Sequence, residues 1–166
     1  QVPDRIIEAD GALALPGLVN AHTHVAMGLL RNYADDMALM PWLQQKIFPA
    51  EEKLAAEDVY WGSMLSIGEM IRSGVTTFAD MYFFMDKTAE AVELSGVRAN
   101  LSMGMAASSA EEAREKTAAL GDFHGRWNNG PGGRVLVDAG RDAVYTCVPD
   151  ALEEIAGEDD GDTGDE

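Results

Sequence analysis

Two histidines separated by one residue, His22 and His24, are the side chains of this sequence whose type and spacing best fit metal chemistry. They follow a short apolar run that begins after Pro16 and Gly17. In an extended strand, residues i and i+2 point to the same face, so both imidazoles would face one point. Imidazole nitrogens are common metal ligands that suit Zn²⁺, with Fe²⁺ or Mn²⁺ as alternatives. The spacing predicts half of a site for one divalent metal. The plainer interpretation is that one histidine near a strand end makes a core hydrogen bond.

The histidine count limits what this site can be. The sequence contains three histidines, and the third, His124, lies beside Arg126 and Trp127 near a predicted helix end, where we expect a surface position. A catalytic zinc ion usually takes three ligands from the protein and a water molecule. We therefore expect the metal site to be incomplete within this sequence.

Acidic residues dominate the charged positions, with 29 Asp and Glu against 12 Lys and Arg and a net charge of −17 at pH 7. Nucleic acids and anionic membranes repel such a polyanion, so neither is expected as a partner. The charge also predicts a halophilic source, because molar salt screens the self-repulsion and its removal would destabilise the fold. Cys147 is the only cysteine, which favours a reducing cytoplasm. No run approaches the ~18–20 apolar residues of a membrane-spanning helix.

Hydrophobic periodicity alternates between strands and helices along the chain. The helix predicted over residues 57–73 stops at Gly74, and that over residues 87–95 stops at Gly96. This alternation predicts an α/β fold with a parallel sheet. Four such units are about half of a (β/α)8 barrel, which needs about 250 residues. The predicted strands cover residues 18–22, 75–80, 97–103 and 134–138, and the first of them is expected to be fully buried. Three further helices are predicted. One begins at Pro41, a second covers residues 110–120 or extends to Trp127, and a third covers residues 150–155.

The two ends of the sequence depart from this pattern. Residues 6–7 and 12–15 are predicted to form short strands around a turn at Asp10 and Gly11. Residues 158–166 contain six acids, and we expect them to be disordered. A half barrel would leave strand edges unpaired. The chain is therefore expected to be a fragment, a truncated product, half of an assembly, or a smaller open α/β fold.

The segment from Leu15 to His24, Leu-Pro-Gly-Leu-Val-Asn-Ala-His-Thr-His, resembles the first-strand signature of the amidohydrolase superfamily. Among the groups of this superfamily, the 5-methylthioadenosine/S-adenosylhomocysteine deaminases and their chlorohydrolase-like relatives are the ones that residues 6–152 resemble. The resemblance implies a partial (β/α)8 TIM barrel over residues 16–157, with about the first four βα units. Residues 1–15 would then be a remnant of the β-sandwich strands that precede this barrel. The other matching positions are Leu29, Leu30, Arg31, Asp35, Asp36, Trp42, Leu43 and residues 48–51 and 74–82.

The activity that the resemblance implies is hydrolytic deamination of an adenosine-type nucleoside or related heterocycle, at a non-peptide C–N bond. His22 and His24 would be the first-strand ligands of a metal that activates water. The family takes its other ligands and a proton-shuttling Glu from later strands, which this sequence does not contain, so no catalytic residue is expected within it. A complementing barrel half, or a homo-oligomer, would be the protein partner. The alternative is a non-catalytic truncated remnant that at most associates with a full-length relative.

The resemblance also assigns three substrate-binding positions. Glu51 falls where the group places a carboxylate that binds ribose hydroxyls, and a solvated acid beside Glu52 is the alternative. Trp42 would line the pocket or, in the plainer interpretation, anchor its helix in the core. Asp142 stands where the group has a substrate-binding His, and an ionised Asp cannot donate a hydrogen bond to a purine nitrogen.

Two residues at predicted strand ends complete the candidates. Asp80 lies at the functional end of a barrel strand, although we favour a role as a cap for the loop that follows it. Met103 stands where some members of the group carry an Arg for the amino-acid carboxylate of the larger substrate. This difference argues against S-adenosylhomocysteine as the substrate.

Overall fold

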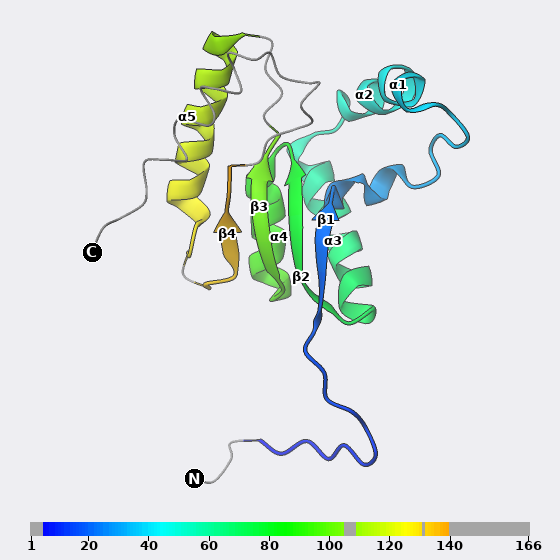
Figure 1. Ribbon diagram of the computed structural model, residues 1–166, viewed down its shortest axis with the longest axis vertical. Helices are drawn as coiled ribbons and strands as arrows, with labels where there is room; N and C mark the ends of the chain where they lie inside the picture. Colours follow the sequence, from blue (N-terminus) through cyan, green and yellow to red (C-terminus); the bar gives the residue numbers. More distant parts are fainter. Residues whose placement is uncertain (1–4, 105–108, 131, 140–166) are drawn as a thin grey trace.

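The structure is a computed structural model that describes residues 5–104, 109–130 and 132–139 (Figure 1). Strands and helices alternate along most of it, as the sequence predicts. The elements are, in chain order, β1 (Leu18–Thr23), η1 (Val25–Leu30), α1 (Leu39–Trp42), η2 (Leu43–Ile47), α2 (Phe48–Glu51), α3 (Ala56–Arg72), β2 (Val75–Tyr82), α4 (Met85–Ser95), β3 (Arg98–Met103), α5 (Ala110–Trp127) and β4 (Val135–Val137).

The four strands form one parallel sheet in the order β1-β2-β3-β4. Helices α3 and α4 lie behind this sheet in Figure 1, and none of the described helices forms a layer on the opposite face. A doubly wound fold would reverse its strand order and place helices on both faces. Strands in sequence order with helices on one side are the arrangement of a (β/α)8 barrel. The predicted partial barrel of about four βα units is confirmed, and the smaller open fold is not.

Local sequence signals set the helix boundaries. At the start of α3, the Asp58 carboxylate accepts a hydrogen bond from the backbone N–H of Ala55 at 2.8 Å. Gly74 and Gly96 end α3 and α4 with φ of +79° and +81°, values that glycine adopts without strain. Helix α5 reaches Trp127, the longer of the two predicted limits. The helix predicted over residues 150–155, the acidic tail and Asp142 lie outside the described residues.

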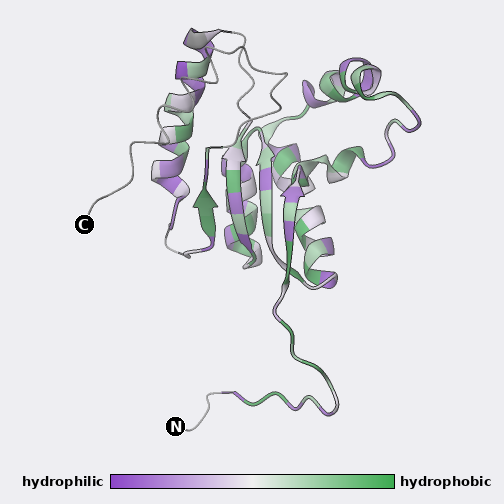
Figure 2. Ribbon diagram, viewed as in Figure 1, coloured by the Kyte–Doolittle hydropathy of each residue, from purple (hydrophilic) through white to green (hydrophobic). Residues whose placement is uncertain are grey.

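The main core lies between the sheet and its helices. Phe78 and Leu101 point from β2 and β3 into it, and Ile67, Val92 and Phe123 from α3, α4 and α5 meet them, all at most 1% exposed. Figure 2 shows β4 in the green of apolar residues, and green and purple segments mixed along the other strands and the helices. In the part of the chain that the structure describes, no helix combines the length and apolar character needed to cross a membrane.

Two predictions near the amino terminus are wrong. The turn at Asp10 and Gly11 forms, but residues 6–7 and 12–15 are not strands, because no partner strand for them exists among the described residues. Strand β1 was expected to be fully buried, yet Leu18 and Val19 are 61% and 66% exposed. The physical reason is that β1 is an edge strand, and the described chain does not cover its outer side.

Asp80 ties the end of β1 to β2. Its carboxylate Oδ1 accepts hydrogen bonds from the backbone N–H of Val25 and from the hydroxyl of Thr23, each at 2.8 Å. The side chain is only 4% exposed, and among the described residues Oδ2 has no partner. Burial therefore raises the pKa of Asp80 to about 6, against the opposing effect of these two hydrogen bonds. One buried acid holds the residues on both sides of His24.

The raised pKa of Asp80 makes a prediction for stability. A folded-state pKa near 6, against 3.8 for the free side chain, means that the folded chain binds the proton more tightly. Stability from this group is therefore full below pH 4, and about 3 kcal/mol is lost as the pH rises to 7. D80N keeps an oxygen acceptor but cannot ionise. Urea unfolding at several pH values should show D80N gaining about 3 kcal/mol relative to the native chain between pH 4 and pH 7.

D80A is the matched comparison, because it also lacks the charge but leaves the Val25 N–H and the Thr23 hydroxyl without this acceptor. It should be less stable than D80N by about 1–3 kcal/mol at every pH. Unfolding curves of D80N and the native chain that stay parallel from pH 4 to pH 7 would contradict this account of Asp80.

Candidate functional site

The two histidines of the predicted metal pair lie together at the carboxyl end of β1. Their ring centroids are 5.3 Å apart and the rings are nearly perpendicular, at 77°. Two imidazoles that bind one tetrahedral ion at Zn–N distances near 2.0–2.1 Å have centroids roughly 5 Å apart. His22 is exposed and His24 is half-buried, so the pair is accessible from the open face. The spacing of the two rings therefore fits a shared metal ion.

A second contact sets which nitrogen of His24 is available. Its Nδ1 lies 2.7 Å from the backbone oxygen of Met81 on β2. A carbonyl oxygen can only accept, so Nδ1 donates the proton and Nε2 keeps its lone pair. Metal-binding histidines commonly have such a partner on the other nitrogen, which fixes the tautomer and the orientation of the ring. The donor chemistry of His24 thus also fits a metal ligand.

Further ligands are not gathered around this pair. Among the described residues, no group of three or more His, Cys, Asp or Glu side chains is arranged to hold a metal ion. His124 is exposed on α5, as predicted. Within the described part of the chain, the candidate site therefore consists of two candidate ligands, His22 in β1 and His24 directly after it.

A hollow of about 250 Å³ lies beside His22, at the carboxyl ends of the strands. It collects polar side chains from all four strand ends, where barrel enzymes carry their active sites. On its far side the Asn100 amide donates to the Asp138 carboxylate. The polar residues that line it are His22, Thr23, Asp80, Asn100, Ser102 and Asp138.

Glu51 reaches the site from the helical segment that precedes α3. Its Oε1 accepts a hydrogen bond at 2.7 Å from the hydroxyl of Tyr82, at the carboxyl end of β2. Partial burial raises the pKa of Glu51, and the Tyr82 hydroxyl and the nearby His24 oppose that rise. Glu51 is therefore half-buried and bonded to the sheet. The interpretation of this residue as a freely solvated acid beside Glu52 does not fit these contacts.

The other predicted substrate positions have different surroundings. The Trp42 indole N–H donates to the backbone oxygen of Ala34 at 3.0 Å, so it holds the loop before α1 and only its ring remains for a ligand. Met103 ends β3 in register with Tyr82. Asp142 belongs to the undescribed residues, so its predicted role stays a prediction.

Two residues of β2 matter more than the sequence indicated. The sequence favours Asp80 as a cap for the loop after its own strand; instead its carboxylate accepts from Thr23 at the end of β1 and from Val25 at the start of η1. Tyr82 is a functional candidate that only the structure reveals. Residues i and i+2 of a strand share a face, so Tyr82 lies on the same buried face of β2 as Asp80. Its partner Glu51 lies 31 positions away in sequence, a separation that no local pattern reports.

Comparison with known proteins places these features in a family. The model of the amidohydrolase family matches residues 13–160. A curated 5-methylthioadenosine/S-adenosylhomocysteine deaminase from Pelotomaculum thermopropionicum is 52% identical over 155 residues, which are 92% of this chain and 35% of that protein. The chain thus spans about a third of the length of the curated relatives that it matches.

Solved structures agree with the sequence matches. An adenosine deaminase from Xanthomonas campestris with bound zinc superposes with a TM-score of 0.78 at 37% identity, over 88% of this chain and 34% of that one. The atrazine chlorohydrolase of Arthrobacter aurescens, complexed with zinc, gives the same TM-score at 19% identity, over 89% of this chain and 39% of that one, which shows the fold alone. The family model, the close relatives and the shared fold agree that this chain belongs to the amidohydrolase family.

Proposed function

We propose that this chain is the amino-terminal part of a metal-dependent hydrolase that deaminates an adenosine-type nucleoside or a related heterocycle. The observation that carries the proposal is the His22–His24 pair, with Nδ1 of His24 engaged by Met81 and Nε2 left for a ligand. Family membership and relatives named as deaminases support the same reaction class.

The proposed metal is one divalent ion, with zinc preferred to Fe²⁺ or Mn²⁺ because related solved structures contain zinc. His22 and His24 would hold it. When bound, such an ion lowers the pKa of a water molecule toward ~7 and so makes hydroxide available at neutral pH. The contribution of this chain is to orient the two imidazoles, through Met81 and through the Asp80 bonds on either side of His24.

The proposed substrate contacts surround this pair. Glu51 would accept hydrogen bonds from ribose hydroxyls, since a carboxylate with one oxygen bonded to Tyr82 retains free acceptor sites. The ring of Trp42 would form part of the pocket wall, and Asp142 would take the position of the family's substrate-binding His. Met103, which cannot pair with a carboxylate, favours 5-methylthioadenosine or adenosine over S-adenosylhomocysteine.

The remaining barrel strands are the proposed protein partner, in the same polypeptide or from a second one. Leu18, Val19 and Leu136 are 50–66% exposed on the sheet. In a closed barrel such residues are covered by neighbouring strands and by interior side chains. The proposed setting is the cytoplasm, and the net charge of −17 opposes nucleic acid and anionic membranes as partners. The second candidate function, a non-catalytic remnant that associates with a relative, uses the same exposed edges.

Zinc binding tests the histidine pair without requiring activity. Isothermal titration should show one zinc ion per chain, bound weakly because two ligands are supplied, and both H22A and H24A should abolish binding. H124A is the matched control, because it removes an exposed histidine from α5 and should bind zinc like the native chain. Equal loss in H124A would contradict the assignment of the site to β1.

Ammonia release tests the reaction. The chain should be mixed with the carboxyl-terminal two thirds of the Pelotomaculum relative, which would supply the missing strands. We expect zinc-dependent ammonia release from 5-methylthioadenosine or adenosine in the mixture, and its loss when the chain carries H24A. Complex formation without any release would favour the non-catalytic alternative, and release by the relative's fragment alone would contradict a role for this chain.

A further inference from the structure

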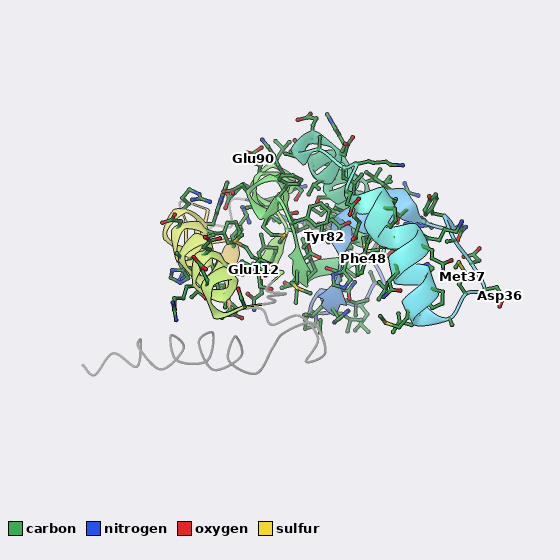
Figure 3. The ribbon with its side chains drawn as sticks, turned by 90° about the horizontal axis from the view of Figure 1, so that it is seen from above. Asp36, Met37, Phe48, Tyr82, Glu90 and Glu112 are labelled. Carbon is green, nitrogen blue, oxygen red and sulfur yellow. The ribbon has the colours of Figure 1, made fainter. Side chains whose placement is uncertain are left out.

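We propose that Tyr82 is a positioning residue whose hydroxyl fixes residues 39–51, and the Glu51 carboxylate with them, beside the His22–His24 pair. Figure 3 looks onto the carboxyl ends of the strands and shows Tyr82 between the sheet and the helical segment that carries Phe48. The ring of Tyr82 lies 6.3 Å from that of His24, and its hydroxyl lies 2.7 Å from Glu51. Tyr82 therefore contacts the candidate substrate-binding residue Glu51 and lies near the candidate metal ligand His24.

The segment formed by α1, η2 and α2 has few attachments to the rest of the fold. Among the described residues, the Tyr82–Glu51 bond is the one hydrogen bond that joins residues 39–51 to the sheet. The indole of Trp42 bonds within the preceding loop, at Ala34. The position of the segment over the strand ends thus depends on the Tyr82 hydroxyl more than on any other polar contact.

The apolar packing of this segment is limited to one buried side chain. Ile47 is buried at 3% exposure, but it is not part of the main core cluster between the sheet and its helices. Leu39, Met40 and Phe48 are about half exposed, at 46–57%. Burial of Ile47 and the hydrogen bond to the Glu51 carboxylate are therefore comparable contributions to holding the segment, and of the two the hydrogen bond is the contact that acts directly on Glu51.

Tyr82 itself is held firmly. It is 7% exposed and stacks on Phe83 with ring centroids 4.0 Å apart. Its backbone oxygen accepts from the N–H of Gly104 at 3.0 Å, and β2 pairs with β3 up to this residue. The hydroxyl thus has a position set by the sheet, and it can impose that position on Glu51.

The consequence for ligand binding rests on the proposed function. With Oε1 bonded to Tyr82, the free acceptor sites of Glu51 lie mainly on Oε2, which has no partner among the described residues. A carboxylate held in one orientation selects ligands with adjacent donors, and the two ribose hydroxyls of a nucleoside are such a pair. Tyr82 would therefore contribute to nucleoside binding without touching the nucleoside.

Hydrogen exchange tests the positioning role directly, because it needs no activity. In Y82F, the amides of residues 43–52 should exchange about tenfold faster, while those of α3 and α4 keep their native rates. E51A should produce the same local increase, and the Y82F/E51A double variant should add nothing further, since both remove one contact. Y60F is the matched control, because Tyr60 loses a hydroxyl that bonds to none of the described residues.

Unchanged exchange at residues 43–52 in Y82F, additive effects in the double variant, or an equal increase across α3 and α4 would each overturn the proposal. In an assembly that deaminates, Y82F should also raise KM for 5-methylthioadenosine about tenfold with kcat unchanged. A lowered kcat at unchanged KM would likewise contradict a positioning role. If no assembly is active, the proposed function fails, and the exchange result still decides the role of Tyr82.

Discussion

The hydrogen bonds from Thr23 and Val25 to the buried carboxylate of Asp80 are the constraint on which the candidate site depends. They fix the residues on both sides of His24 against β2. The next two residues of the same strand extend this arrangement. The backbone oxygen of Met81 orients the His24 ring, and the hydroxyl of Tyr82 holds Glu51. Three consecutive residues of β2 thus position the candidate metal ligand His24 and the candidate substrate-binding residue Glu51, which lie elsewhere in the sequence.

This arrangement lowers the stability of the folded chain at neutral pH. Asp80 is buried with one carboxylate oxygen unpartnered in the described structure, and its pKa is raised to about 6. An apolar residue at this position would avoid the charge, but it would leave the Val25 N–H without its acceptor, and the Thr23 hydroxyl would keep only the backbone oxygen of Ala79. A buried acid that lowers stability while it orders a loop is typical of a site shaped by function.

The sequence predicts the elements of the fold well, because their signals are local. Gly74 and Gly96 end helices where their positive φ is needed, and the apolar runs of β2 and β3 lie where predicted. Prediction from the sequence fails where a feature depends on contacts between residues that are far apart in the chain. The apolar residues of β1 predict a buried strand, but Leu18 and Val19 are exposed because β1 is an edge strand that no other described residue covers. Similarly, the Asp80 and Tyr82 contacts join residues 31–57 positions apart, so only the folded sheet reveals them.

The central claim is that β2 holds His24 with Nδ1 protonated and Nε2 ready for a ligand. Long-range ¹H–¹⁵N NMR of the histidine side chains, assigned with H22A and H24A, tests it most directly. We predict that neutral His24 is the Nδ1-protonated tautomer and that zinc shifts its Nε2 signal together with a nitrogen of His22. An Nε2-protonated His24, or zinc-induced shifts at its Nδ1, would contradict the account.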